Sequence, residues 1–219
     1  MIFDKAFVIS LEESRRRRDA FFNSAKKNSL EAEWIKGIHG EKVDLQRLKE
    51  QGTLTEAFTL KMPGSLGCLL SHLSVWELIE KDPSVNCALI FEDDAVLCRN
   101  FSKRLTSIPH SALPQDWDMI WLGWQRINCT PVNNYFGKPN GAKKNNGHFC
   151  YLINSRSIEK IKTILLPYDN KRSKDVLLRK NFHSFNAYFL LNRLARTRII
   201  EWGSVRKKIN SKQRHKDKS

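Results

Sequence analysis

The sequence predicts an α/β fold with a mostly parallel central sheet. Short apolar runs of strand length alternate along its 219 residues with segments whose apolar residues recur at helical spacing. Such alternation is typical of parallel sheets, because each helix carries the chain back to the edge where the next strand begins. A hydrophobic content of 41% and the lack of internal repeats fit one domain with a sizeable core.

The N-terminal part of the chain predicts two strands and two helices. Residues 6–11 form an apolar run typical of a buried strand. A helix is expected over 12–27, because acidic residues at its start suit the positive end of the helix dipole and lysines close it. A short strand over 34–38 follows, and then a short helix over 43–49 that a glycine ends.

The middle of the chain continues the alternation. Residues 66–79 carry a wide apolar stripe at helical spacing. Residues 87–91 read Cys-Ala-Leu-Ile-Phe, which predicts a strand buried on both faces. A helix is expected over 100–108, with two prolines marking its exit, and a strand over 117–123 that runs into a glycine.

The last segments are less regular. Residues 125–147 are rich in Asn, Gly, Pro and Lys and lack periodicity, which predicts a long loop such as a mobile flap. A strand is expected over 149–153, and a helix over 157–166 capped by the serine at its first position. The apolar-bearing segments 176–179 and 185–194 are predicted to be helical.

Three consecutive acids, Glu92, Asp93 and Asp94, follow the strand 87–91 directly, in a chain whose net charge is +15. On an extended backbone Glu92 and Asp94 point to one side and Asp93 to the other. Ligands of α/β sheets bind at the carboxyl ends of strands, and hard divalent cations prefer carboxylate oxygens. The pattern therefore indicates a metal site, with a solvated acidic turn or a cap for the following segment as the alternatives.

Positive charge is concentrated at residues 206–219, which hold seven basic residues and one acidic residue. We expect one domain over 1–205 and a basic, disordered tail over 206–219. Such a tail can bind an anionic membrane surface or nucleic acid, or it can serve solubility alone.

The five cysteines form no C-x-x-C pair, and several lie in apolar runs. This pattern predicts free thiols in a reducing compartment. The sequence also shows no secretory signal pattern and no apolar stretch long enough to span a bilayer. We therefore expect a cytoplasmic protein that the tail can hold at the inner face of the inner membrane.

Four sequence blocks, in a fixed order, resemble glycosyltransferase family 25. This is the family of bacterial lipooligosaccharide galactosyltransferases, to which the collagen galactosyltransferases are related. The resemblance covers roughly residues 5–180, and its most specific parts are the run Gly-Cys-Leu-Leu-Ser-His-Leu at 67–73 and the acid triplet. The four blocks are residues 8–11 with Arg17 and Arg18, residues 64–76, residues 89–94 and residues 147–153.

The resemblance implies a GT-A-like, Rossmann-related domain that transfers a hexose, typically galactose, from a UDP-sugar to a lipid-linked saccharide acceptor of the lipooligosaccharide or lipopolysaccharide core. It implies Mn²⁺ or Mg²⁺ at Glu92 and Asp94. An inverting reaction needs one base for the acceptor hydroxyl, and Asp175 is the leading candidate, with Asp169 and His72 behind it. The positions matched to donor binding are Ser10, Leu11, Arg17, Arg18, Ser71 and Asp93.

One departure from the family pattern lies beside the candidate base, where Ser173 and Lys174 stand in place of Pro-Val. Two other classes of protein are alternatives to the transferase. A metal-dependent phosphohydrolase needs further acids at neighbouring strand ends, for which Asp118 is the obvious recruit. A nucleic-acid-binding protein is suggested by the basic tail, but the chain lacks an aromatic-basic RNA motif. The resemblance favours the transferase.

Overall fold

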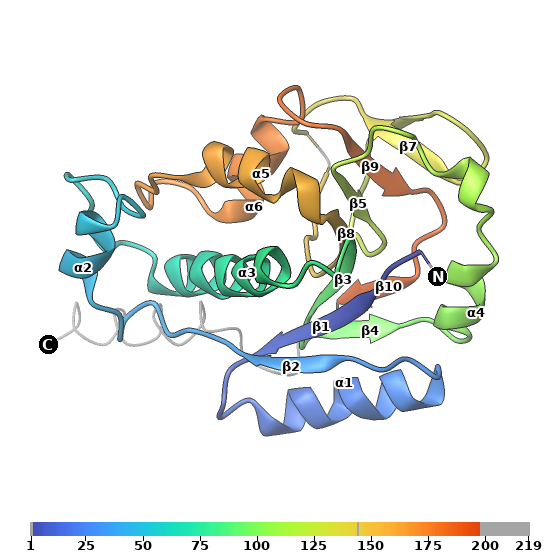
Figure 1. Ribbon diagram of the computed structural model, residues 1–219, viewed down its shortest axis with the longest axis horizontal. Helices are drawn as coiled ribbons and strands as arrows, with labels where there is room; N and C mark the ends of the chain where they lie inside the picture. Colours follow the sequence, from blue (N-terminus) through green and yellow to red (C-terminus); the bar gives the residue numbers. More distant parts are fainter. Residues whose placement is uncertain (1, 144, 198–219) are drawn as a thin grey trace, which may run out of the picture.

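An eight-stranded sheet with helices on both faces forms the body of the protein (Figure 1). The computed structural model describes residues 2–143 and 145–197, and the fold is given for these residues. Across the sheet the strand order is β2-β1-β3-β8-β5-β9-β7-β6, and a separate two-stranded sheet pairs β10 with β4. The strands are β1 (Lys5–Ser10), β2 (Glu33–Lys36), β3 (Cys87–Glu92), β4 (Ala95–Leu97), β5 (Met119–Trp121), β6 (Cys129–Pro131), β7 (Phe136–Pro139), β8 (Cys150–Asn154), β9 (Ala187–Leu190) and β10 (Ala195–Thr197).

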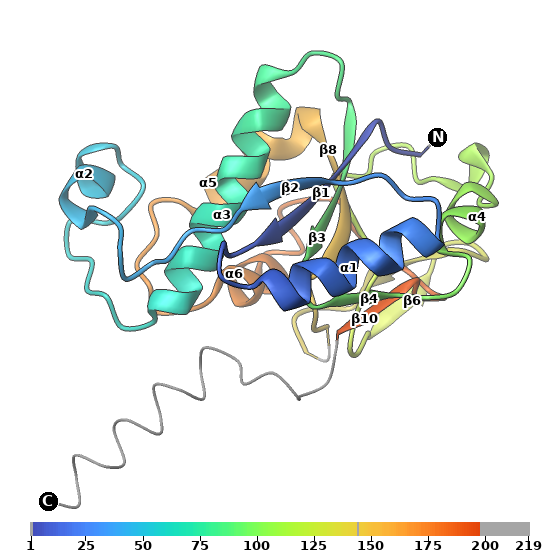
Figure 2. The ribbon, with the colours of Figure 1, turned by 90° about the horizontal axis from the view of Figure 1, so that it is seen from below.

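Two helical layers enclose the sheet. Helices α3, α5 and α6 lie on one side, and α1 lies on the other, where it crosses beneath β1 and β2 (Figures 1 and 2). The helices in the described residues are α1 (Arg15–Lys27), α2 (Leu45–Glu50), α3 (Pro63–Lys81), α4 (Phe101–Thr106), α5 (Ile158–Leu165) and α6 (Lys174–Lys180), with 3₁₀ turns at His110–Ala112 and Ser155–Ser157. None of these helices combines the length and the hydropathy that a bilayer span requires.

Successive residues of the central strands enter opposite cores. In β3, Ala88 and Ile90 belong to the core that α3, α5 and α6 cover, whereas Leu89 and Phe91 belong to the core that α1 and α4 cover. Because both faces of β3 are buried, the strand reads as a continuous apolar run rather than an alternating one. The same alternation, continued past Phe91, sends Glu92 and Asp93 to opposite faces of the sheet.

The strands β2, β1 and β3 run parallel, so their carboxyl ends meet at one edge of the sheet. The strand β8 lies between β3 and β5 and is antiparallel to both, and β7 is antiparallel to its neighbours β9 and β6. The other six strands share one direction, which makes the sheet mixed but mostly parallel in sense. The predicted α/β class is therefore confirmed.

Two segments differ from the sequence prediction. The segment 125–147 is not a featureless loop but contains the β6–β7 hairpin, whose turn Asn133 closes by accepting hydrogen bonds from the backbone N–H groups of Tyr135 and Phe136. The segment 185–194 holds the strand β9 rather than a helix. All four residues of β9 are buried, and a short apolar run of that kind has no period that separates strand from helix.

Two helix starts also differ from the prediction. The helix α1 begins at Arg15 rather than Glu12, so the two expected acids lie in the preceding turn. There Glu12 pairs with Lys36, and Glu13 with His39, instead of facing the helix dipole. Ser157 does precede α5, but its hydroxyl donates to Asp118 Oδ1 at 2.5 Å and does not cap the helix.

Candidate functional site

The acid triplet lies at the carboxyl end of β3, where the strand leaves the sheet. The strand ends at Glu92, and Asp93 and Asp94 form the turn into β4. Glu92 faces α3 and Asp93 faces α1, as the alternation of β3 predicts. Because the backbone turns after Glu92, the expected extended geometry for Glu92 and Asp94 does not apply.

Asp93 joins the ends of β1 and α1. Its Oδ2 accepts a hydrogen bond from the Ser10 hydroxyl at 2.7 Å, and its Oδ1 lies 3.2 Å from the Arg17 guanidinium. Burial raises the pKa of Asp93, and Arg17 and Ser10 reduce that rise because they stabilise the charged form. The Arg17 side chain stays 30% exposed.

Arg18 and Leu11 form the next contact along this edge. The Arg18 guanidinium donates to the Leu11 carbonyl at 3.0 Å and lies 3.8 Å from the centre of the Trp34 ring. The indole of Trp34 donates to the Ser10 carbonyl at 2.9 Å, while the residue as a whole is 37% exposed. A partly exposed aromatic ring packed against a guanidinium suits stacking of a flat ring.

On the α3 side, Glu92 ends a chain of buried hydrogen bonds. The indole N–H of Trp76 donates to the Tyr151 hydroxyl at 3.1 Å, and that hydroxyl lies 2.6 Å from His72 Nδ1. His72 Nε2 lies 3.2 Å from Glu92 Oε1. One arrangement satisfies every donor: Tyr151 donates to Nδ1, and the Nε2–H of His72 donates to Glu92. Burial and the nearby Lys174 keep the pKa of His72 well below its usual value, so the ring is neutral.

Lys174, at the first turn of α6, is 1% exposed and lies between two carboxylates. Its Nζ is 3.8 Å from Glu92 Oε1 and 3.7 Å from Asp175 Oδ1. Burial lowers the pKa of Lys174, but Cys68, Asp175 and Glu92 outweigh burial, so the net shift is upward and the ammonium keeps its charge. Burial likewise opposes ionisation of Asp175, but His148 and Lys174 overcome it and its pKa is lowered.

His148 completes the wall beside Asp175. Its Nδ1 is 3.6 Å from Asp175 Oδ1, and its ring packs on Trp121 with 4.7 Å between the ring centres. Neither ring nitrogen of His148 has a hydrogen-bond partner among the described residues. Burial lowers the pKa of His148 to about 4, so this histidine is neutral at pH 7.

Asp94 has the environment expected of a cation ligand. Its Oδ1 is buried without a hydrogen-bond partner in the described part of the chain. Burial, with Glu92 and Asp93 next to it, raises the pKa of Asp94 to about 7. A divalent cation would give that oxygen a partner and relieve the repulsion among the three acids. Glu92 also forms a cluster with Cys68 and His72, whose ligand atoms all lie within 4.8 Å of one another.

Ser71 lies in this region but uses its hydroxyl within the protein. It donates to the Gly67 carbonyl at 2.6 Å and accepts from the Ile38 N–H at 2.8 Å, and so ties α3 to the segment after β2. A side chain at Gly67 would put its Cβ 2.3 Å from the Ile38 carbonyl oxygen. Part of the Gly-Cys-Leu-Leu-Ser-His-Leu run therefore serves this close packing.

Two acids that were weighed from the sequence have their contacts outside the triplet. Asp118 precedes β5, which runs in the direction of β3, so Asp118 sits at the opposite edge of the sheet from Glu92. There it accepts from Ser157, Lys160 and the Asn186 N–H. Asp169 pairs locally with Lys171.

Among the residues of the site that were not singled out as functional from the sequence are Trp34, His148, Tyr151 and Lys174. Two of them, His148 and Tyr151, lie in a block that carries the family resemblance, but their spacing shows only a buried strand. Lys174 carries the clearest signal, because a basic residue replaces an apolar one directly before Asp175.

Known proteins resemble the chain in sequence over most of its length. Residues 3–199 match the family described as "Glycosyltransferase family 25 (LPS biosynthesis protein)". The chain is 31% identical over 144 residues to "Probable inactive glycosyltransferase 25 family member 3" of Rattus norvegicus, covering 58% of this chain and 24% of that protein. It is 26% identical over 144 residues to "Procollagen galactosyltransferase 2" of Homo sapiens, covering 58% and 22%. The chain thus spans about a quarter of the length of these relatives.

Solved structures resemble the chain in fold. A glycosyltransferase involved in the glycosylation of the major capsid of PBCV-1 aligns with a TM-score of 0.52 at 10% identity, covering 96% of this chain and 98% of that one. A UDP-glucose pyrophosphorylase complexed with UDP-glucose aligns with a TM-score of 0.51 at 11% identity, covering all of both chains. At these identities the likeness concerns the fold alone, and it confirms the expected GT-A-like class.

Proposed function

Because the chain belongs to glycosyltransferase family 25, we propose that it is a glycosyltransferase that moves a hexose from a UDP-sugar to a saccharide acceptor. Galactose is the proposed hexose, since one relative is named a procollagen galactosyltransferase. The family description points to lipopolysaccharide biosynthesis as the setting. UDP is the proposed carrier, in line with the UDP-glucose complex of one structural neighbour.

The observation that carries this proposal is the unpartnered oxygen of Asp94 among three carboxylates, beside Arg17. Asp94, with Glu92, would hold Mn²⁺ or Mg²⁺, which when bound neutralises the charge that develops on a leaving diphosphate. Arg17 adds a fixed positive charge at the same edge, and its link to Asp93 orients it. Asp93 thus acts on the donor through Arg17 and Ser10.

The donor is proposed to lie along the carboxyl ends of β1 and β2. Ser10 and Leu11 shape the backbone there, and Arg18 packs over one face of the Trp34 ring, which leaves the other face as the proposed stacking surface for uracil. Ser71 supports this edge from behind by holding the segment after β2.

Asp175 is proposed as the base. Lys174 and His148 both face its Oδ1, which leaves Oδ2 to take the proton of the acceptor hydroxyl. The oxygen of that hydroxyl attacks the anomeric carbon as the proton leaves it. The bond from that carbon to the diphosphate breaks in the same displacement, and the configuration inverts. His72 is neutral and enclosed, with both nitrogens engaged by Tyr151 and Glu92, so its proposed role is to position Glu92.

The acceptor is proposed to be lipid-linked, with the protein held at an anionic membrane surface by the basic residues of 206–219. That tail lies outside the described residues. The proposed division of the chain is a catalytic domain over 1–205 followed by the tail.

The test is a donor screen on the purified protein. Release of UDP is measured from UDP-Gal, UDP-Glc, UDP-GlcNAc and UDP-GalNAc, with Mn²⁺ and a panel of saccharide acceptors. Asp94→Asn is expected to lower kcat about a hundredfold, the usual effect of losing one electrostatic contact to the transition state. The matched control is Asp19→Asn, at an exposed acid on α1. Full metal-dependent transfer by Asp94→Asn would contradict the metal assignment, and failure of every UDP-sugar to bind or react would contradict the function.

A further inference from the structure

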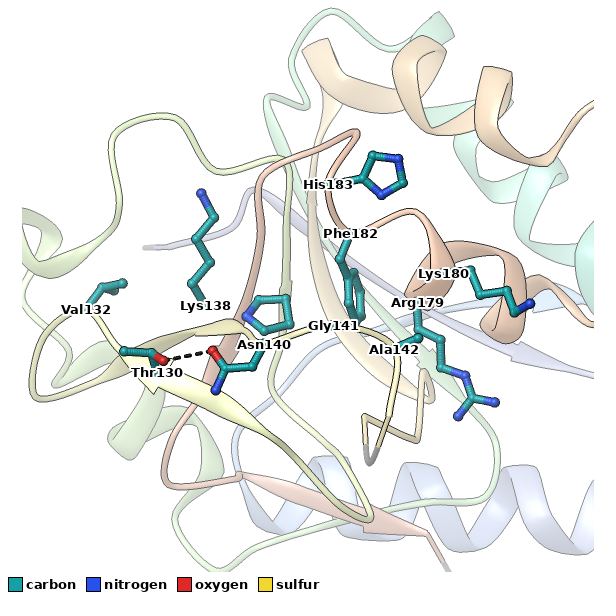
Figure 3. Close-up of a pocket in the computed structure, with 11 residues that line it drawn as sticks. Thr130, Val132, Lys138, Asn140, Gly141, Ala142, Arg179, Lys180, Phe182 and His183 are labelled. Atoms are coloured by element: carbon teal, nitrogen blue, oxygen red, sulfur yellow. Dashed lines mark hydrogen bonds between the residues drawn. The ribbon is translucent and has the colours of Figure 1, made fainter.

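A second candidate binding site lies away from the acid triplet. A cavity of about 490 Å³ opens between the β6–β7 hairpin, the chain that follows it, and the end of α6 (Figure 3). Its volume falls within the range of small-ligand sites, about 300–1,000 Å³. Thr130 and Asn140, joined by a hydrogen bond of 2.8 Å, line the hairpin side.

All the ionisable side chains that line this cavity are basic. Lys138, Arg179, Lys180 and His183 line it, and none of the described residues that line it carries a carboxylate. In Figure 3, Lys138 and His183 lie on either side of Phe182, with the His183 ring pointing away from Lys138, and Lys180 extends away from both. Lysine, arginine and histidine N–H groups around an apolar wall bind phosphate or carboxylate well, because they offer charge and several donors.

The helix α6 lines the cavity at one end and carries the proposed catalytic base at the other. Asp175 and Arg179 are four residues apart on α6, so they lie on the same face of the helix. That face follows the segment 146–148, because Arg179 donates to the Asn146 side chain and Asp175 faces His148 at 3.6 Å. The two positions are about 6 Å apart along the helix axis.

We propose that this cavity anchors an anionic substituent, phosphate or carboxylate, of the acceptor saccharide, so that the hydroxyl that is glycosylated is directed toward Asp175. The inference rests on the proposed transferase function, because the acid triplet is proposed to bind the donor and the cavity would bind the acceptor. Lys138 and His183 are the proposed contacts of the anion, and for this the Lys138 ammonium, which lies 5.9 Å from the centre of the Tyr188 ring, turns into the cavity. Arg179 is held by Asn146 and lies between the cavity and Asp175.

Binding to the full-length protein without donor tests the proposal. Isothermal titration calorimetry compares glucose 6-phosphate, glucuronate and uncharged glucose as probes. The phosphate and carboxylate arms identify which anion the site takes. We expect at least one charged probe to bind ten times or more tightly than glucose, with an affinity that salt weakens.

Lys138→Gln combined with His183→Gln should reduce that affinity at least tenfold, while Lys103→Gln on α4, an exposed lysine away from the cavity, should not change it. Equal binding of charged and uncharged probes, or unchanged affinity in the double variant, would overturn the proposal. Binding of UDP in the presence of Mn²⁺ is measured in parallel. Loss of the anion preference with UDP binding intact refutes the cavity alone, whereas an intact preference without any UDP binding refutes the transferase.

Discussion

Replacing Lys174 by methionine tests how the site holds its carboxylates together. The Lys174 ammonium is buried 3.8 Å from Glu92 and 3.7 Å from Asp175. At an effective dielectric constant of about 20, each of these separations corresponds to about 4 kcal/mol of attraction. Methionine fills a similar length of space, so the change removes the charge and largely keeps the packing.

The net loss should be smaller than the sum of the two attractions. The side chains of Glu92 and Asp175 are 31% and 43% exposed, so water screens both pairs, and the variant no longer has to bury an ammonium. We therefore expect Lys174→Met to lower the free energy of unfolding by about 2–3 kcal/mol at pH 7. Lys180→Met, at an exposed position on the same helix, should change it by less than about 0.5 kcal/mol.

The pH dependence gives a second readout. In the wild type, burial already raises the pKa of Glu92, whereas the pKa of Asp175 is lowered. Without the ammonium, the folded-state pKa values of both carboxyl groups should move upward. Groups with a raised folded-state pKa favour the folded protein at low pH and lose that contribution as the pH rises. The deficit of Lys174→Met relative to the wild type should therefore shrink between pH 8 and pH 5 in urea denaturation. A deficit below about 0.5 kcal/mol at pH 7, or one that is the same at both pH values, would refute this reasoning.

Two further changes probe the buried polar groups. Tyr151→Phe removes the hydroxyl between Trp76 and His72, so that two buried ring nitrogens lose their partner. We expect it to lower the free energy of unfolding by about 1–3 kcal/mol. A change within experimental error in urea denaturation would contradict the hydrogen-bond chain. Burial raises the pKa of Asp118, but the hydrogen bonds that it accepts, above all from the Lys160 ammonium, outweigh burial. The pKa of Asp118 is therefore below its ordinary value of 3.8. The ionised carboxylate of Asp118 therefore stabilises the fold above pH 3.8, and this stabilisation is lost as the pH falls through the lowered pKa. Asp118→Asn should have a lower free energy of unfolding than the wild type at pH 7 and approach it near pH 3. The same difference in unfolding free energy at both pH values would count against the lowered pKa of Asp118.

The position of the acid triplet and the opposite directions of Glu92 and Asp93 could be predicted from the sequence, whereas the direction of Asp94 could not. A buried strand reads as an unbroken apolar run, so the end of β3 is visible at Glu92. The two-residue period of a strand then places Glu92 and Asp93 on opposite faces. The stripe of α3 was equally clear, because its apolar residues recur over a long helix.

Short segments without a period were the ones that prediction missed. The four residues of β9 are buried on both faces, so the sequence at 187–190 fits a strand or a helix equally well. The β6–β7 hairpin is short and half-exposed, and it becomes regular only through its pairing with β9. Tertiary pairing decided these elements, since local preference did not.

The sequence by itself determined where the carboxylates stand, and only the tertiary structure decided what they contact. Tyr151 meets His72 across 79 residues because β8 inserts antiparallel beside β3, and no local pattern announces that insertion. Lys174 reaches Glu92 because α6 packs beside α3. The period of a strand is a property of its own backbone, so the place of the acidic residues was predictable. A buried ion pair depends on the topology that brings two distant segments together, so the pairing of Lys174 with Glu92 was not.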